Sequence, residues 1–446
     1  MAYAKIVNAP FIFDDYSHIA EAARSGWHAT MALFGPVERK PGLFLRPVGF
    51  VLYRLNYQWA GIHATRWHVG SISLHAIDAW LVYLLCRNLG LRRSGSLCAG
   101  LIFAMSAAAA EPVAWIDAGF DLVTTAFVLV VLLLVCRYLG SGNHAPLAAA
   151  LAVTVMGVLS KESAYCLPAL VVLTALIHPR ADRPRALRAF LLIAAACIIV
   201  FAYRWWALGG VGGYLVRGAG AAEFLRYNLV PRANALLLRL WTVLFSPVNW
   251  SEPLTPISKA VLAALPLPIV SLVLVARIPR RQFLACLGFT LAAAIPAQEM
   301  LLIGLDLSGT RVLYLPAVGM ALLWGLLSDS VGRRAQVVLL GLSLAIQVTA
   351  LEHNLVPWHD VPESARAACR SFGLQLASLS DPVTVGRLPA TERGVVFLQN
   401  GLPECVEFNS GVSADRIRAL GGTDRDQAAT FVWDDERGFI HGRPPH

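Results

Sequence analysis

Ten apolar segments, each with the length and apolarity needed to cross a lipid bilayer as a helix, occupy most of this chain of 446 residues. Only 15% of the residues are charged, whereas soluble domains carry about a quarter, so most of the chain is expected to lie in lipid. The predicted spans cover roughly residues 67–89, 95–110, 121–139, 145–160, 164–178, 188–208, 258–276, 283–303, 312–329 and 335–352. This pattern predicts an all-α polytopic membrane protein with about 10–11 transmembrane helices.

The basic residues lie between the apolar segments rather than in one patch, although the net charge is +9. This distribution is typical of cytoplasmic loops and excludes nucleic acid as a partner. Arginines mark four such loops, at 92–93, 180–188, 277–281 and 333–334. All four loops fall on the cytoplasmic side only if an eleventh apolar segment, 233–249, does not cross. Residues 209–257 are therefore expected to form one long external excursion.

This orientation divides the chain into three regions. Residues 1–66 form an external loop region, residues 67–352 a transmembrane core, and residues 353–446 a small soluble domain on the external side. We expect a bacterial inner-membrane protein with its active site and C-terminal domain in the periplasm. Residues 1–13 are too short and too polar for a signal peptide or a span, so we expect a first helix upstream. The alternative is that the first span pulls the N-terminal tail across.

Two adjacent carboxylates, Asp14 and Asp15, precede the first predicted span. Paired acids at a bilayer surface cost desolvation and repel each other, so chemistry or ion binding explains them better than packing. Either could be a general base that takes a proton from an acceptor hydroxyl. The alternative is a solvated cap at a helix N-terminus.

The first predicted span carries four polar residues, His68, Ser71, His75 and Asp78, at spacings of three and four. These spacings place all four on one helical face, which is expected to face the bundle interior or a substrate cavity. Hydrogen bonding between helices is the alternative. The two histidines are two turns apart, so they do not predict a shared metal.

Further charged residues are expected at the external face. Arg46 lies beside a predicted interfacial helix, 49–59, and could bind a phosphate or a sugar, or merely reach to the membrane surface. Glu111, Asp117 and Asp121 could bind a divalent cation or sugar hydroxyls, or cap a connector.

Two more cations are candidates for phosphate binding. Lys161 and Glu162 join two spans in a short turn, and Lys161 is one of four lysines in the chain. Arg311 stands at the start of a predicted helix, where an arginine and the helix amides suit a phosphate, and Tyr314 lies one turn deeper. The alternatives are a solvated ion pair, and an arginine and tyrosine at the membrane interface.

The tail from residue 353 is polar and predicts a small α/β domain. Residues 394–399 and 405–408 are predicted strands joined by an Asn400-Gly401 hairpin turn. Residues 429–433 predict a third strand, and 364–379 a helix. Cys369 and Cys405 could form a disulfide outside the cytosol. This domain is expected to recognise an acceptor or cover the site, or to be a passive cap.

Several of these segments, in this order, resemble the GT-C superfamily of integral-membrane glycosyltransferases over roughly residues 8–350. The likeness is strongest to bacterial relatives of the transmembrane O-mannosyltransferases that carry TPR repeats. The motifs that carry it are Phe13-Asp14-Asp15, Arg46-Pro47, His68 to His75, Glu111-Pro-Val-Ala-Trp-Ile with Asp121, Ser160-Lys161-Glu162, and Arg311-Val-Leu-Tyr314-Leu-Pro316. Phe120 before Asp121 departs from the family, in which an arginine is expected.

The resemblance implies an enzyme that activates an acceptor hydroxyl for attack on a polyprenyl-phosphate sugar, with inversion at the anomeric carbon. It assigns the base to Asp14, with Asp15 as the second choice. Arg311 and Lys161 would hold the donor phosphate, and Glu111 and Asp121 would shape the sugar or acceptor pocket. No metal ligand is assigned, although a divalent cation is compatible with the acids.

Two other functions fit the same chain. A transporter or flippase of a lipid-linked saccharide would also be polytopic, but it should show inverted repeats and polar groups at the membrane midplane. A non-catalytic membrane scaffold is the other alternative. The acceptor could be a protein, a lipid or a glycan, and the sequence does not identify the sugar.

Overall fold

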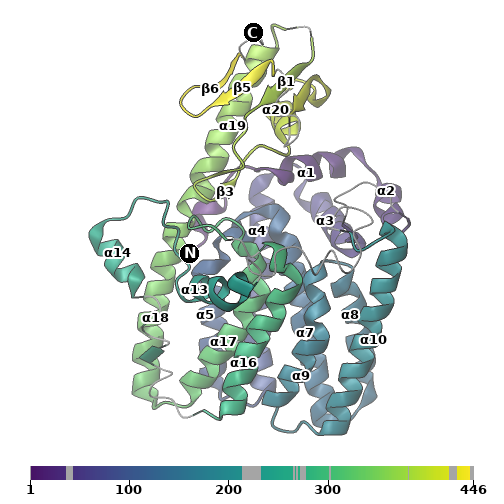
Figure 1. Ribbon diagram of the computed structural model, residues 1–446, viewed down its shortest axis with the longest axis vertical. Coiled ribbons are helices and arrows are strands. Elements are labelled where there is room, and N and C mark those ends of the chain that lie inside the picture. Colours follow the sequence, from purple (N-terminus) through teal and green to yellow (C-terminus); the bar gives the residue numbers. More distant parts are fainter. Residues whose placement is uncertain are drawn as a thin grey trace.

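The computed structural model describes residues 2–36, 44–212, 233–264, 267, 270–271, 278–300, 303–379, 381–420 and 429–441. Long helices stand side by side in a bundle, and a small α/β domain projects from one end of it (Figure 1). Five of the described helices are long and apolar enough to cross a membrane, or six if one bent pair is a single span. The predicted all-α polytopic membrane fold with a small C-terminal α/β domain is confirmed.

The bundle helices follow the apolar segments of the sequence. They are α4 (Ala64–Asn88), α5 (Arg93–Ala104), α7 (Gly119–Ser141), α8 (His144–Val158), α9 (Leu167–Ile177), α10 (Arg183–Leu208), α16 (Arg280–Ala294), α17 (Tyr314–Asp329) and α18 (Arg333–Asn354). The span that contains α17 is 94% buried, whereas that of α10 is 22% buried. The first therefore forms the centre of the bundle, and the second leaves most of its apolar surface for lipid.

Two predicted spans differ from the observed helices. In place of the predicted span 95–110, the structure has α5 followed by a helical stretch, Ala107–Ala114, which is bent by 42° from α5. This stretch ends in α6 (Ala110–Ala114), and Pro112 lies within it. Of the predicted span 258–276, the structure describes mainly α14 (Pro256–Ala263), and most of the remainder lies outside the described residues.

Segment 233–249, which was predicted not to cross the membrane, contains only short helical pieces. A π-helical turn, Ala235–Arg239, leads into α13 (Leu240–Phe245). Neither is long enough to cross a bilayer, which needs about 20 residues.

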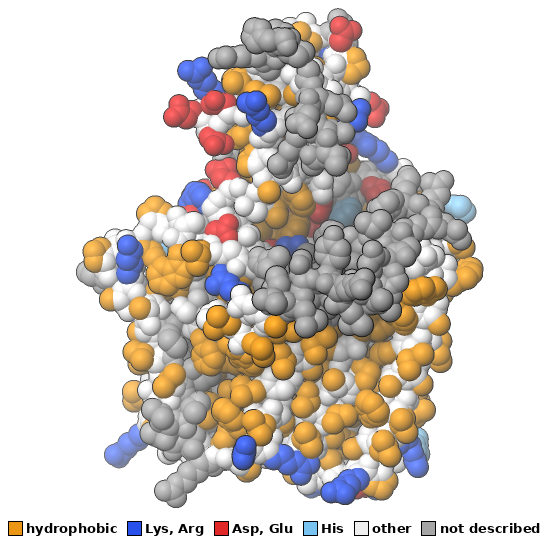
Figure 2. Space-filling view, viewed as in Figure 1, with side chains coloured by type: hydrophobic (Ala, Val, Ile, Leu, Met, Phe, Trp, Pro, Cys, Tyr) orange, Lys and Arg blue, Asp and Glu red, His pale blue; other side chains and the backbone are white. Residues whose placement is uncertain are grey.

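The two ends of the bundle differ in charge. Apolar side chains cover the sides of the bundle, and basic side chains line the edge farthest from the C-terminal domain (Figure 2). The α9–α10 and α17–α18 connections, which carry predicted cytoplasmic arginines, lie at that edge (Figure 1). Which compartment each end faces stays a prediction.

The N-terminal region covers the opposite end of the bundle. It contains α1 (Asp14–Arg24), α2 (Trp27–Ala32) and α3 (Pro47–Ala60). Pro47 begins α3 at a position where proline has no hydrogen bond to lose. The predicted helix at 49–59 is therefore confirmed.

The C-terminal domain begins without a break in helical structure. The long helix α19 (Val356–Leu376) follows α18 after a single residue, Leu355. It packs against a four-stranded sheet of order β4-β1-β5-β6, in which β1 is parallel to β4 and β5, and β5 is antiparallel to β6. These strands are β1 (Val383–Gly386), β4 (Ile417–Ala419), β5 (Phe431–Asp434) and β6 (Gly438–His441). The predicted helix 364–379 lies in α19 up to residue 376, and the predicted strand 429–433 overlaps β5 from residue 431.

The predicted hairpin at Asn400-Gly401 is wrong. Its second strand lies in a helix, α20 (Leu402–Ser410), and its first shortens to β3 (Val395–Val396), which pairs with β2 (Thr391–Glu392). Gly401, with a φ of 79°, is the residue before the helix, and a proline in the first turn favours helix over strand. α20 also places Cys405 against α19, where it forms a disulfide with Cys369 across a Cα–Cα distance of 6.0 Å.

Candidate functional site

The two adjacent acids begin α1 and lie in different environments. Phe13, just before them, has a φ of 50°, an unfavourable backbone conformation for a residue with a side chain. Asp15 is buried, and its carboxylate accepts hydrogen bonds from the backbone N–H of Ile12 (3.1 Å) and of Asp117 (2.9 Å). Asp14 is half-buried, and its Oδ1 accepts a hydrogen bond from Nδ2 of Asn400 at 3.0 Å. Asp14 is therefore the more accessible of the two.

Burial is the main cause that raises the pKa of Asp14, to about 6, and the nearby Asp117 carboxylate adds to it. His18, Asn400 and Arg311 oppose this rise. Burial and Asp117 also raise the pKa of Asp15 well above its usual value. A carboxyl with a pKa near 6 is largely ionised at neutral pH and is still a useful proton acceptor.

His18 joins this group, and the sequence analysis did not select it. It lies one helical turn after Asp14 on α1, and its Nδ1 is 2.6 Å from Oδ1 of Asp117. Burial lowers the pKa of His18, but the Asp117 carboxylate outweighs this effect, and the pKa rises to about 9. The spacing of four after Asp14 was the available signal, because such residues share one helical face.

Lys161 pairs with an acid from another helix. Its Nζ lies 2.6 Å from Oδ2 of Asp121, in the first turn of α7, and both side chains are largely buried. Two of the predicted site residues thus form one ion pair, although 40 positions separate them in the chain.

Glu162 lies between two guanidinium groups. Its Oε2 accepts hydrogen bonds from Nε and Nη2 of Arg46 at 3.0 and 2.7 Å. Its Oε1 accepts one from Nη1 of Arg204, at the end of α10, at 2.7 Å. Arg204 was not predicted as a site residue. An arginine near the end of an apolar span is the feature of the sequence that could have indicated it.

Glu111 and Arg311 form a third buried ion pair. Nη1 of Arg311 donates to Oε1 of Glu111 at 2.7 Å, and the backbone N–H of Arg311 donates to Oε2 at 3.0 Å. The Thr310 hydroxyl donates to the same Oε2 at 3.0 Å. The guanidinium also lies over the Trp115 ring, 4.5 Å from its centroid.

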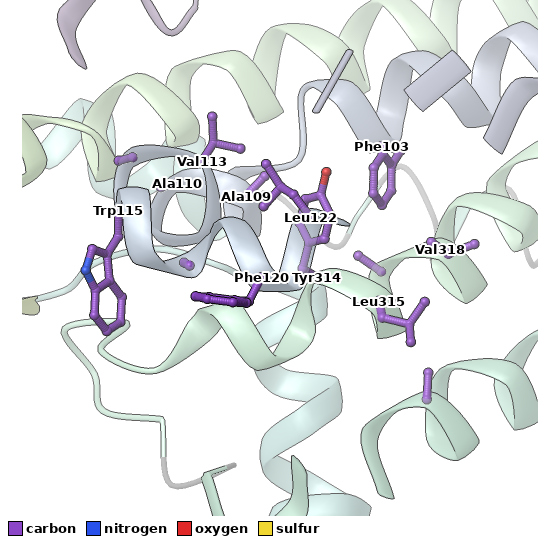
Figure 3. Close-up of a cluster of buried hydrophobic side chains, with 14 of the residues drawn as sticks. Phe103, Ala109, Ala110, Val113, Trp115, Phe120, Leu122, Tyr314, Leu315 and Val318 are labelled. Atoms are coloured by element: carbon purple, nitrogen blue, oxygen red, sulfur yellow. The ribbon is translucent and has the colours of Figure 1, made fainter. Parts of the chain in front are cut away.

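Apolar packing fixes the segments that carry these groups. Figure 3 shows Ala110 and Val113 of α6 and the following Trp115 in one cluster with Phe120 of α7 and with Tyr314 and Leu315 of α17. A charged side chain anchored on such a close-packed base has little freedom to move away from its partner.

The remaining predicted residues form a separate network within the bundle. The Tyr314 hydroxyl donates to Oδ2 of Asp78 at 2.9 Å and lies 2.7 Å from Nδ1 of His75. Nε2 of His75 lies 3.1 Å from the Tyr3 hydroxyl, and Nε2 of His68 lies 3.0 Å from the Ala9 carbonyl oxygen. The two histidines and Asp78 lie on the buried face of α4, as predicted, and hydrogen bonds from them tie the N-terminal segment and α17 to that helix.

The ion pairs Lys161–Asp121, Arg46–Glu162–Arg204 and Arg311–Glu111, together with the groups around Asp14, are called the charged cluster below. An apolar cavity of about 380 Å³, whose lining includes Phe120 next to Asp121, lies between α3, α4 and α7. Tyr53, Trp67, Ile116 and Phe120 are among the residues that line it. Within the described ranges, no three His, Cys, Asp or Glu side chains converge in a group that could hold a metal ion. The acids of the cluster are instead partnered by cations, N–H groups or an amide.

Comparison with known proteins shows that no family model matches the chain. Over 119 residues, 27% of its length, the chain is 31% identical to "Protein O-mannosyl-transferase Tmtc1" of Drosophila melanogaster. Those residues span only 14% of that protein. This match agrees with the likeness to O-mannosyltransferases that the motifs indicate.

Two solved structures cover 94% of the chain at low identity. They are ArnT from Cupriavidus metallidurans bound to undecaprenyl phosphate (TM-score 0.45, 13% identity) and the same protein in the apo state (TM-score 0.44, 12% identity). Each match covers 87% of the ArnT chain.

Proposed function

We propose that this chain, similar in part to an O-mannosyltransferase, is a membrane glycosyltransferase that transfers a sugar from a polyprenyl-phosphate donor to an acceptor hydroxyl. The observation that carries the proposal is the position of Asp14 at the end of an apolar bundle. It is a half-buried carboxylate whose pKa is raised to about 6, and it lies close enough to His18 and Arg311 for their charges to act on it. Such a site can meet a lipid-borne phosphate at the membrane surface and deprotonate a hydroxyl there.

In the proposed reaction, Asp14 takes the proton of the acceptor hydroxyl while the hydroxyl oxygen attacks the anomeric carbon of the donor sugar. The bond from that carbon to the phosphate oxygen breaks, and the polyprenyl phosphate leaves with its electrons. Attack from the face opposite the leaving group inverts the anomeric centre. Lys161 and Arg311 stabilise the charge on the leaving phosphate, because preorganised cations in a partly buried site act strongly on developing charge.

Asp15 has a different proposed role. Two backbone N–H groups already bind its carboxylate, so it orders the start of α1 and the segment before α7. This favours Asp14 over Asp15 as the base. Glu111, Asp121 and Glu162 hold the cations in place, and Arg46 belongs to the same charged cluster. His68, His75 and Tyr314 support the site from within the bundle.

Transfer of labelled sugar from polyprenyl-phosphate mannose, glucose and aminoarabinose, measured in membranes that contain the protein, tests this proposal. We expect Asp14→Asn to reduce transfer by about 100-fold or more, as for loss of a general base. Glu21→Gln, a matched change at an exposed residue of the same helix, should leave transfer intact.

Two outcomes would contradict the proposal. Full transfer by Asp14→Asn would remove the assigned base. No transfer from any donor by folded wild-type protein would instead favour a transporter or a scaffold. The position of the charged cluster at one end of the bundle, rather than midway along it, argues against a transporter.

The proposed location is the bacterial inner membrane, with the charged cluster and the C-terminal domain on the periplasmic side. The basic connections at the opposite end of the bundle support this orientation. The acceptor is a protein, lipid or glycan that reaches this face.

A further inference from the structure

We propose that Asn400 of the C-terminal domain positions the carboxylate of Asp14, so that this domain completes the catalytic site. The inference rests on the proposed function. The Asn400-Gly401 pair, predicted from the sequence as a hairpin turn, instead faces the candidate base.

The contact between the two regions is direct. Nδ2 of Asn400 donates to Oδ1 of Asp14 at 3.0 Å. Gly401 follows with a φ of 79°, and a Cβ on it would clash with the Phe13 carbonyl oxygen. Only glycine fits this position, both for its backbone conformation and for the close approach. The turn therefore meets the backbone immediately before the two acids.

Neighbouring contacts fix the domain in this place. The Tyr16 ring of α1 packs edge-on against Phe408 of α20, with 6.0 Å between centroids, and Arg24 pairs with Glu407. A second attachment lies at the turn between β2 and β3, where Arg393 binds the Glu252 carboxylate through Nε at 2.6 Å and Nη2 at 2.5 Å. Two separate attachments hold the domain more firmly than one hydrogen bond could.

Asn400 differs from the other groups that act on Asp14. His18 lies on the same helix, Asp117 precedes α7, and Arg311 precedes α17, and all three carry charge. Asp15 is held by backbone N–H groups. Asn400 supplies a neutral donor to one carboxylate oxygen. This donor restricts rotation of the side chain and favours its ionised form.

The experiment compares Asn400→Ala and Asn400→Asp with wild type. Asn400 is exposed, so neither change should prevent folding. Gln399→Glu is the matched control, because it makes the same kind of amide-to-acid change one residue away. The Gln399 side chain binds the Leu388 carbonyl within the C-terminal domain. The readouts are the pH dependence of sugar transfer, with kcat and donor KM measured separately, and hydrogen exchange at the start of α1.

We expect Asn400→Ala to lower kcat with little change in donor KM, and to move the rising limb of the pH profile to higher pH. A shift of one pH unit would reduce transfer about tenfold at pH values below that limb. Asn400→Asp should move the limb further, because its charge repels ionised Asp14. Exchange at the first residues of α1 should become faster in both variants, and Gln399→Glu should match wild type.

An unchanged pH profile and kcat in Asn400→Ala would overturn the inference, as would equal effects in Gln399→Glu. If the wild type uses no donor, the proposed function fails. The exchange measurement would still decide whether Asn400 orders the start of α1, so the two failures can be told apart.

Discussion

His18 and Asp117 lie 2.6 Å apart, Nδ1 to Oδ1, although 99 positions separate them in the chain. The pair joins α1 to the segment that precedes α7, next to the candidate base. It shows that the short N-terminal helix is held on the bundle by charge as well as by apolar packing.

This pair predicts a pH dependence of stability. The pKa of His18 is raised to about 9 from an ordinary value near 6.5. The contribution of protonated His18 to the free energy of unfolding is therefore complete below about pH 6.5 and is lost as pH rises through 9. The melting temperature in detergent should fall more between pH 7 and 9.5 for wild type than for His18→Gln. Parallel curves for the two proteins would contradict the prediction.

Transfer activity should depend on pH through Asp14. A base must be ionised, and the pKa of this carboxyl is raised to about 6, so transfer should increase as pH rises through about 6 and then level off. Initial rates at saturating donor between pH 4.5 and 8 would measure the midpoint. A rate that is already level at pH 4.5 would contradict the raised pKa of Asp14, because an ordinary aspartate titrates near pH 4.

Asp15→Asn should affect the stability of the fold more than the rate of sugar transfer. The amide keeps one acceptor oxygen but directs its NH₂ group at one of the two backbone N–H groups that now bind the carboxylate. Leaving a buried donor without a partner costs about 1–3 kcal/mol. Urea unfolding would measure this loss, and transfer per folded molecule should stay within about tenfold of wild type, unlike the loss of a general base. A loss as large as that of Asp14→Asn would instead assign Asp15 to the reaction.

Glu111→Gln should destabilise the protein strongly. The change leaves the buried Arg311 guanidinium without its carboxylate, and breaking one partner of a buried pair costs about 3–5 kcal/mol. The double variant Glu111→Gln, Arg311→Met should be more stable than Glu111→Gln alone, because it removes the unpaired charge. Measured unfolding free energies that simply add would show that the two residues do not interact.

The disulfide tests both the C-terminal domain and its location. Replacing Cys369 by Ser should destabilise the domain by about 2–4 kcal/mol, which proteolysis of the tail would reveal. Because disulfides persist in oxidising compartments, the pair should be oxidised in intact cells, and thiol labelling of these two residues should need prior reduction. Reduced Cys369 and Cys405 in untreated cells would place the domain on the cytoplasmic side.

Most of the bundle and its two charged ends could be predicted from local patterns of residues. Spans such as 67–89 and 121–139 could be predicted because hydrophobicity over about 20 residues is a local property. The buried face of α4 followed from the spacing of its polar residues, which a helix places on one side. The helix α3 and the helical part of the tail followed from equally local patterns.

The pairing of the charged residues depends instead on tertiary packing. Asp14 and Asp15 are adjacent in sequence, yet their partners differ. Asp15 accepts hydrogen bonds from the backbone N–H groups of Ile12 and of Asp117, which is 102 positions away, whereas Asp14 accepts one from Asn400, 386 positions away. The hairpin expected at Asn400-Gly401 is instead the turn that leads into α20, where Pro403 in the first turn favours a helix. The disulfide between Cys405 and Cys369 then joins α20 to α19. Pairings over such distances depend on how helices pack, and no local pattern of residues encodes that packing.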